Sequence, residues 1–317
     1  MTNDITLIIT VLNEARTISN WFESVARQSR LPDRVVICDG GSIDNTPEVI
    51  NEWAAKMRMP VTVIDAPGAN ISEGRNLAFR QSESEWIAVT DAGTILDPHW
   101  LEELERHTSD ADVISGFFYP SGDAAFERFL ASMITFRSSE VDASTFLPSS
   151  RSLMIRRSAW QSVGGYPEWL DYCEDLVFDL ALKKVGCRFA FAPKALVSWS
   201  ARPNLKSFAK QYYRYGRGDG KAGLWPRRHA IRYATYAAGV LAVIAAFRWP
   251  WLFLGIGVGL VAYNWRYFRR VALSRELLGG WRIAWLFAVI PVGTVGDFAK
   301  MFGYPAGLLW RRKRDLT

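Results

Sequence analysis

The sequence is poor in cysteine and histidine, with three of each among its 317 residues. The cysteines at positions 38, 173 and 187 are too few for a disulfide scaffold, and the sequence contains neither a CxxC pair nor the spacing of zinc ligands. Hydrophobic residues make up 49% of the chain and charged residues 22%, which excludes an intrinsically disordered protein. What remains is a globular chain of about two domains' length.

Charge is divided unevenly along the chain. Residues 200–317 hold 20 Lys and Arg against 4 Asp and Glu, whereas residues 1–199 hold 18 against 28. The basic part also contains long apolar runs, and seven of the 14 tryptophans lie within residues 225–310. This pattern predicts a soluble domain joined to a membrane-associated one. Nucleic-acid binding is not expected, because the basic residues flank apolar runs.

The amino terminus has no basic start and meets Glu14 after a short apolar run, which argues against a signal peptide and for a cytoplasmic front part. Short apolar runs then alternate with helical patterns, which predicts a parallel α/β sheet covered by helices on both faces. Ligands of such sheets bind at the carboxyl ends of the strands. The predicted strands are Ile5–Val11, Arg34–Cys38, Val61–Ile64 and Trp86–Thr90, and the predicted helices between them are Ala15–Arg27, Thr46–Lys56 and Ser72–Gln81.

The middle of the chain is less regular, and residues 138–151 form a polar segment. An amphipathic helix with several aromatic residues is expected over Asn204–Arg217. The other predicted elements are the helices Ser121–Phe136, Ser158–Val163 and Glu174–Gly186 and the strands Arg188–Ala192 and Ala195–Trp199.

Residues 231–247 and 251–265 are nearly continuous apolar runs at the short end for membrane spans, which need about 17–25 residues. A buried hairpin of a soluble protein is the alternative. The basic segments 266–282 and 311–314 are expected in the cytoplasm by the positive-inside rule. Residues 283–310 must then begin and end on one side, as a re-entrant segment, an interfacial helix or a second hairpin.

Polar residues follow three of the predicted strands and would meet at the ligand edge of the sheet. They are Thr10, Asn13 and Glu14 at the end of the first strand and just after it, Asp39, Gly41 and Ser42 after the second, and Asp91 with Gly93 after the fourth. Asp39 is placed to accept hydrogen bonds from a nucleobase or ribose, and Asp91 is suited to a divalent cation that neutralises a diphosphate. Helix capping and turn chemistry are the simpler explanations for Asn13 and the glycine-rich turn.

Three further motifs carry charge on predicted helices. Arg75 lies in Gly74-Arg-Asn76 and could pair with a base or a phosphate, although a solvated arginine is the default. Glu174 and Asp175 open a helix, where the helix dipole favours acids and where a carboxylate could also serve as a base. Gln211, Arg214 and Tyr215 lie on the amphipathic helix, where the arginine could hold a leaving diphosphate or lie at a membrane surface.

Taken in order, these motifs resemble the inverting family 2 glycosyltransferases of GT-A fold. The matching pieces are V-x-N-E, D-G-G-S-x-D-x-T, G-R-N, D-A-x, G-G-Y followed by E-D, and Q-x-x-R-Y-G, which together cover about residues 5–220. The resemblance implies a GT-A domain over residues 1–200, an interface helix and linker over 201–230 and a membrane region over 231–317. Members with such a tail build surface polysaccharides or glycolipids at the inner membrane, with the catalytic domain in the cytoplasm.

The resemblance also implies roles for single residues. Asp91 would be the first acid of the family's D-x-D and meet ribose or metal, Asp175 would be the base, and Glu174 would support it. Thr10, Asn13, Glu14, Asp39, Gly41, Ser42 and Arg75 would frame the nucleotide, while Gln211, Arg214 and Tyr215 would line the diphosphate and acceptor channel.

Two positions depart from the family pattern: Gly93 replaces the usual metal ligand, and Tyr215 replaces a tryptophan. Mg²⁺ or Mn²⁺ would therefore rest on Asp91 and the diphosphate. We expect transfer of a single sugar, from UDP more commonly than from GDP, to a hydroxyl of a lipid-linked acceptor. A polyprenyl-phosphate sugar synthase and a non-catalytic nucleotide-sugar-binding scaffold are the alternatives.

Overall fold

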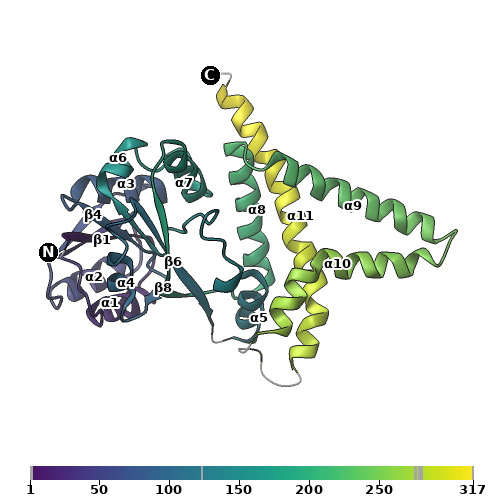
Figure 1. Cartoon of the computed structure of the whole chain (residues 1–317), viewed down its shortest axis with the longest axis horizontal. Helices are drawn as coiled ribbons and strands as arrows, with labels where there is room; N and C mark the ends of the chain where they lie inside the picture. The colour runs from purple at the N-terminus through teal and green to yellow at the C-terminus, as the bar shows by residue number, and fades with distance from the viewer. Residues whose placement is uncertain (1–2, 123, 275–276, 278–280, 316–317) are drawn as a thin grey trace. The chain divides into compact units, whose positions relative to one another are not determined.

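The structure, a computed structural model, describes residues 3–122, 124–274, 277 and 281–315 (Figure 1). It divides into two compact units, each made of two segments of chain: residues 1–119 with 137–200, and residues 120–136 with 201–317. Residues 120–136 therefore group with the carboxyl-terminal part rather than with the domain predicted over residues 1–200.

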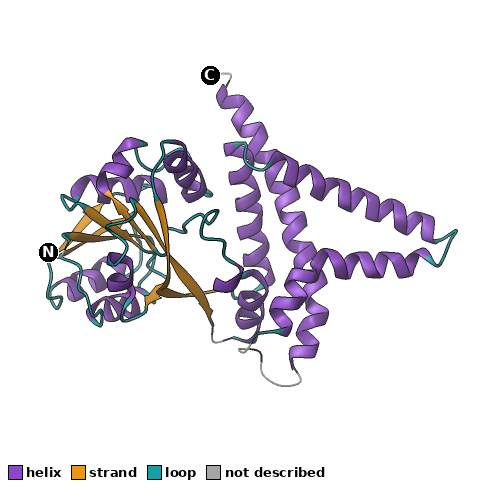
Figure 2. Ribbon diagram, viewed as in Figure 1, coloured by secondary structure: helices purple, strands orange, loops and turns teal. Residues whose placement is uncertain are grey.

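The first unit is built on an eight-stranded sheet. Its elements are β1 (Ile5–Val11), α1 (Ile18–Ala26), β2 (Arg34–Asp39), α2 (Thr46–Ala54), β3 (Val61–Asp65), α3 (Ile71–Gln81), β4 (Trp86–Val89), β5 (Thr94–Leu96), α4 (Trp100–Glu105), β6 (Val113–Ser121), a 3₁₀ turn (Ser138–Glu140), β7 (Leu153–Arg156), α6 (Arg157–Ser162), α7 (Glu174–Lys184) and β8 (Phe189–Ser200). Figure 2 shows the strands with helices above and below them.

The strand order is β3-β2-β1-β4-β7-β6-β8-β5. β1 to β4 are parallel as predicted, whereas β7 runs antiparallel to β4, β6 to β7 and β5 to β8, so the sheet is mixed beyond the four predicted parallel strands. Antiparallel neighbours need no crossover helix, so the strand–helix alternation that marks β1 to β4 stops there. β6 contains Gly116 and Pro120, which are rare in strands and hide it in the sequence.

The parallel half supplies a rigid base for the loops at its edge. Ile8, Val36 and Ile87 are fully or almost fully buried, and α3 packs on them through Phe79, whose ring stacks on Trp160 at 5.0 Å between centroids. Both faces of these strands are covered, which explains their continuous apolar sequences.

The second unit is helical. It contains α5 (Ala125–Ile134), α8 (Leu205–Ala222), α9 (Pro226–Ala246), α10 (Leu252–Ala272) and α11 (Trp281–Asp315). α9 and α10 lie over the predicted apolar runs at 231–247 and 251–265; α9 begins before the first run, and α10 continues past the end of the second. Residues 283–310 are part of one helix, so the predicted second hairpin does not form; Pro291 and Pro305 lie inside α11 without ending it.

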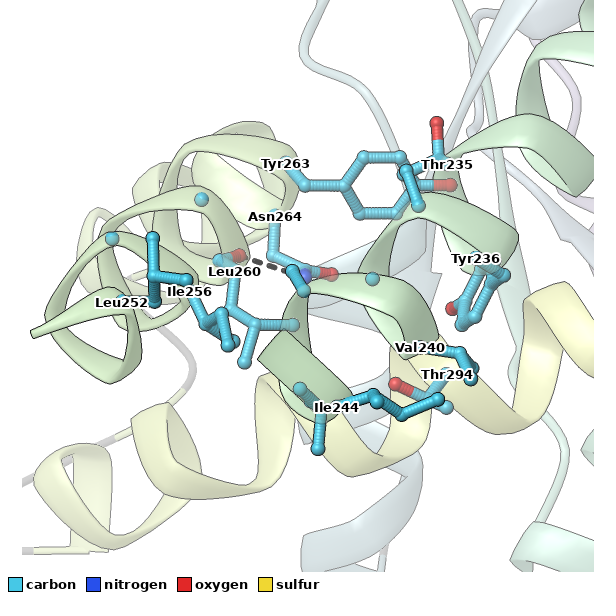
Figure 3. Close-up of a pocket in the computed structure, with 16 residues that line it drawn as sticks. Thr235, Tyr236, Val240, Ile244, Leu252, Ile256, Leu260, Tyr263, Asn264 and Thr294 are labelled. Atoms are coloured by element: carbon cyan, nitrogen blue, oxygen red, sulfur yellow. Dashed lines mark hydrogen bonds between the residues drawn. The ribbon is translucent and has the colours of Figure 1, made fainter. Parts of the chain in front are cut away.

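Two described helices are long and apolar enough to cross a membrane, Pro226–Ala246 and Ile283–Arg314. α9 and α10 also leave many large apolar side chains exposed, including Leu241, Ile244, Leu254 and Val258. Between α9, α10 and Thr294 of α11 lies an apolar pocket of about 670 Å³, whose polar groups are few and include Tyr236, Tyr263 and Asn264 (Figure 3).

Three helices of this unit meet at one partly buried carboxylate. Asp297 of α11 accepts hydrogen bonds from Arg232 Nε at 2.7 Å and Tyr236 at 3.2 Å on α9, and from the Tyr263 hydroxyl at 2.8 Å on α10. A charged group in an apolar environment is tolerated when it is paired in this way. Asp297 therefore fixes how α9 and α10 join α11.

α8 and α11 run parallel and touch through glycines. A Cβ on Gly216 or Gly220 of α8, or on Gly303 or Gly307 of α11, would come within 2.1–2.6 Å of a backbone oxygen of the other helix. Glycines four residues apart on both helices allow backbones to approach this closely, as in membrane helix pairs.

We expect Gly307→Ala to loosen this pair, because its Cβ would collide with the backbone oxygen of Arg217. Overpacking of this kind costs about 1–3 kcal/mol, which should lower the thermal midpoint of the detergent-solubilised chain. Gly255→Ala on α10 is the matched control, because nothing lies within 4 Å of its added Cβ. Equal midpoints for the two variants would contradict the close helix contact.

Candidate active site

The loops after β1 and β2 are tied together at the edge of the sheet. Asn13 has a left-handed backbone with φ of 58°; its N–H donates to Ser42 Oγ at 2.8 Å and its Oδ1 accepts from the N–H of Ile43 at 2.9 Å. The N–H of Glu14 donates to Thr46 Oγ1 at 2.8 Å. The structure thus assigns Asn13 and Ser42 a role in shaping the loop, and nucleotide contact by them stays a prediction.

Asp39 at the end of β2 is buried and organises the turn that follows it. Its Oδ1 accepts hydrogen bonds from the N–H groups of Gly41 and Ser42 at 3.1 and 2.9 Å and from the Ser42 hydroxyl at 2.8 Å. Gly41 has φ of +94°, and an added Cβ would lie 3.0 Å from Pro67 Cα, so only glycine fits there. This turn holds the Asp39 carboxylate in place beside the end of β1.

Arg75 joins three of the predicted motifs. It lies on α3 with its side chain only 3% exposed, and its two terminal nitrogens bind Asp91 Oδ1 at 2.9 Å and Glu174 Oε1 at 2.8 Å. Its guanidinium also lies 5.2 Å from the centroid of the Tyr166 ring. Burial alone would lower the pKa of Arg75, but the Asp91 and Glu174 charges outweigh it and raise that pKa. Arg75 therefore positions acids from β4 and α7, whereas the sequence suggested that it meets the nucleotide.

Asp91 and Asp175 are the acids of this cluster that solvent reaches. The Asp91 side chain is 32% exposed, and Asp175 is half-buried at the start of α7, next to the buried Glu174. Burial raises the pKa of both Glu174 and Asp175, and for Glu174 the neighbouring Asp175 charge adds to the effect. A raised pKa suits a group that accepts a proton near neutral pH.

Asp179 is an acid that the sequence analysis missed. It lies one turn after Asp175 on α7, is 1% exposed, and within the described part of the chain its Oδ2 has no hydrogen-bond partner. Burial, followed by the Asp175 charge, raises the pKa of Asp179 well above its ordinary value. The signal that could have revealed it is the four-residue spacing from Asp175.

Arg151 is the second residue near this cluster that the sequence did not reveal. It ends the polar segment 138–151, and its Nε lies 3.6 Å from Asp91 Oδ2. Asp91 thus has Arg75 on one carboxylate oxygen and Arg151 near the other. Nothing in the spacing of Arg151 from the motifs marks it as part of the cluster.

The donor set does not suit a divalent cation held by the protein. Among the residues that the structure describes, no group of three or more His, Cys, Asp or Glu side chains converges as metal ligands do. Position 93 is glycine, and both oxygens of Asp91 face arginines. The expected Mg²⁺ or Mn²⁺ at Asp91 stays a prediction, and the chemistry below is derived without it.

Gln211, Arg214 and Tyr215 belong to the second unit, on α8. Gln211 is buried and its Nε2 donates to the Tyr215 hydroxyl one turn later, at 2.8 Å. Their predicted contact with the diphosphate and acceptor stays a prediction. Thr10 lies in β1, where its side chain packs under α3: a Cβ on Gly74 would be 2.9 Å from Thr10 Cγ2.

Comparison with known families decides the class of protein. Residues 6–164 match the model described as glycosyl transferase family 2, and residues 86–310 match that of glycosyl transferase family group 2. The chain belongs to glycosyl transferase family 2. It is therefore a glycosyltransferase, and the resemblance inferred from its motifs is confirmed.

The relatives of this family 2 glycosyltransferase include the succinoglycan biosynthesis protein ExoA of Rhizobium meliloti, 27% identical over 77% of this chain and 78% of that protein. The O-antigen chain rhamnosyltransferase RfbN of Salmonella typhimurium is 23% identical over 67% of this chain and 71% of that protein. The mannosyltransferase PcManGT of Pyrobaculum calidifontis, solved with GDP-Man and Mn²⁺, is similar in fold, with a TM-score of 0.59 and 15% identity over 100% of this chain and 89% of that one. The expected GT-A fold is confirmed.

Proposed function

We propose that this glycosyltransferase moves a single sugar, with inversion, from a nucleoside-diphosphate sugar to a hydroxyl of a lipid-linked acceptor in polysaccharide or glycolipid synthesis. The observation that carries the proposal is the Arg75 bridge, which holds Asp91 and Glu174 together beside Asp175. The reaction needs one acid on the donor side and one that removes a proton. Asp91 and Asp175 supply these two acids in the proposal. The names of ExoA and RfbN support a surface polysaccharide as the product.

In the proposed reaction Asp175 accepts the proton of the acceptor hydroxyl. The freed oxygen attacks the anomeric carbon on the face opposite the diphosphate, and the bond from that carbon to the diphosphate oxygen breaks. Glu174, fixed by Arg75, holds the start of α7 and thereby the direction of Asp175. Asp91 lies on the donor side, where the family pattern places the ribose.

The membrane arrangement is also part of the proposal. The α9–α10 hairpin, with its many exposed apolar side chains, inserts into the inner membrane, and the turn at Arg248–Pro250 lies on the far side. α8 carries exposed Lys206 and Lys210 and touches α11 along its length, so this pair lies in the cytoplasmic interface. The first unit then meets its acceptor at the cytoplasmic face.

The proposal also names the nucleotide of the donor and the reacting group of the acceptor. The solved neighbours hold UDP-GlcNAc in TarS and GDP-Man in PcManGT, and we propose UDP here. A polyprenyl-phosphate synthase uses an acceptor that is already ionised and needs no base, so the placement of Asp175 favours a hydroxyl acceptor.

A panel of UDP-, GDP- and dTDP-sugars tests the donor class. A ligand that binds the folded state raises the free energy of unfolding by about 2.7 kcal/mol at a concentration of one hundred Kd. The thermal midpoint of the purified full-length chain therefore rises. Product analysis with polyprenyl phosphate and with polyprenyl diphosphate-linked sugar then identifies the acceptor. If no nucleotide sugar raises the midpoint or is consumed, the proposed function is wrong.

A further inference from the structure

We propose that Arg151 binds the diphosphate of the donor and supplies, from the protein, the positive charge for which many GT-A enzymes use a divalent cation. This inference rests on the proposed function and assigns the anion-binding group of the same site. Four features of the first unit support it: the packing of Arg151, its position beside Asp91, the occupied nitrogens of Arg75, and the space around Gly93.

The backbone of Arg151 is fixed on both sides. Ser150 is buried and its hydroxyl lies 3.0 Å from that of Tyr166. Ser152 is buried as well; its Oγ donates to the carbonyl of Ala195 at 3.1 Å and accepts from Trp100 Nε1 at 2.8 Å. Position 151 is therefore held rigidly although it ends a polar segment.

The Arg151 side chain is mounted on aromatic rings. Its guanidinium carbon lies 4.9 Å from the centroid of the Trp199 ring and 5.6 Å from that of Phe118. Arginine stacks on such rings with the face of its guanidinium, while its N–H groups point outward in the plane of that group. The side chain is 26% exposed, so a ligand can reach it from solvent.

Arg151 also faces both acids of the site. Its Nε is 3.6 Å from Asp91 Oδ2, and its charge acts to lower the pKa of Asp175, which burial raises. A nucleotide bound at Asp91 would bring its diphosphate next to this guanidinium. Arg75 is not able to take that part, because it is 3% exposed and both its terminal nitrogens are bound to acids.

Gly93 also supports a site whose positive charge comes from the protein. A Cβ at this position would meet nothing within 4 Å, so packing does not require glycine there. A metal ligand would fit at the third position of the D-x-D pattern but is not present. In the transfer the breaking bond leaves its electron pair on the β-phosphate oxygen, and a bidentate arginine stabilises that charge without a metal.

The test is binding of UDP, GDP, uridine and guanosine to the full chain and to Arg151→Ala and Arg151→Lys, each with and without EDTA. We expect EDTA to leave wild-type binding unchanged. We expect Arg151→Ala to weaken diphosphate binding by about 10- to 100-fold, Arg151→Lys to weaken it less, and nucleoside binding to stay the same. Adding Gly93→Asp to Arg151→Ala should then make diphosphate binding respond to Mn²⁺.

Several results would overturn the proposal. Unchanged diphosphate binding by Arg151→Ala, or an equal loss for nucleoside and diphosphate, would mean that Arg151 is structural. Wild-type binding that EDTA abolishes and Mn²⁺ restores would return the charge to a metal. Diphosphate binding by the Gly93→Asp, Arg151→Ala chain that ignores Mn²⁺ would contradict the exchange of the arginine for a metal. If the wild-type chain binds neither UDP nor GDP, the proposed function itself has failed, which separates that failure from the ones above.

Discussion

Asp175→Asn is expected to abolish sugar transfer while nucleotide-sugar binding stays nearly normal. The substitution keeps the size of the side chain and its hydrogen bond from the N–H of Leu176, 2.9 Å from Asp175 Oδ1 in the structure, but removes the basic oxygen. Loss of a general base typically costs about 10²- to 10⁴-fold in rate. Initial rates of transfer, together with thermal stabilisation by the donor, measure the two effects separately.

The pH dependence gives a second readout for the same residue. Because burial raises the pKa of Asp175, the acidic limb of the transfer rate should lie at higher pH than an ordinary aspartate would give. Asp110→Asn, on the surface after α4, is the matched control and should leave both rate and limb unchanged. Turnover near wild type by Asp175→Asn would leave only helix capping for this carboxylate.

Arg75→Met should be the most destabilising single substitution of the first unit. Methionine fills much of the same space but leaves Asp91 and Glu174 without their cation, and breaking a buried ion pair costs about 3–5 kcal/mol. Arg80→Met on the same helix is the control: it ends an ion pair with Glu168 whose arginine is 55% exposed, and such surface pairs contribute about 0–1 kcal/mol. Thermal midpoints of the two variants should differ clearly.

The stability deficit of Arg75→Met should shrink in acid. Arg75 acts to lower the pKa of Glu174, so its removal raises that pKa further above the unfolded value. A carboxyl whose folded pKa is raised binds a proton on folding, so the variant loses stability as pH rises through that pKa. A deficit that does not change with pH would place the lost energy in packing against Tyr166 instead.

Much of the parallel half of the sheet can be read from the sequence because each strand is an apolar run followed by a helix. The same regularity locates Asp39, the last residue of β2, and Asp91, which follows shortly after the end of β4. β6 and β7 pair antiparallel although α5 lies between them in the chain, so their pairing requires the structure. A local sequence pattern predicts a strand's place in the sheet only where the strand order follows the order of the chain.

The site also contains residues that a sequence motif reveals and residues that only long-range contacts reveal. Glu174 and Asp175 are adjacent in the sequence, but the contact that Glu174 makes depends on Arg75, which lies 99 residues earlier in the chain. Arg151 and Asp179 escaped notice because their importance comes from long-range neighbours, Asp91 and the buried face of α7, that no local pattern shows. The metal expectation rested on the family pattern, and the arginines around Asp91 became visible only in three dimensions.

The insertion of α5 into the first unit's sequence has a consequence for expression of fragments. Phe129, Leu130 and Met133 are buried, and the Phe129 ring stacks on Trp285 of α11 at 4.7 Å between centroids. A fragment that stops at residue 200 keeps α5 but loses the helices that cover it. The apolar face of α5 would then be exposed to solvent, and the fragment would tend to aggregate. Replacing residues 120–136 with a short polar linker in such a fragment should yield a soluble, crystallisable catalytic half, because the cut then follows the molecule's own division and not the order of the chain.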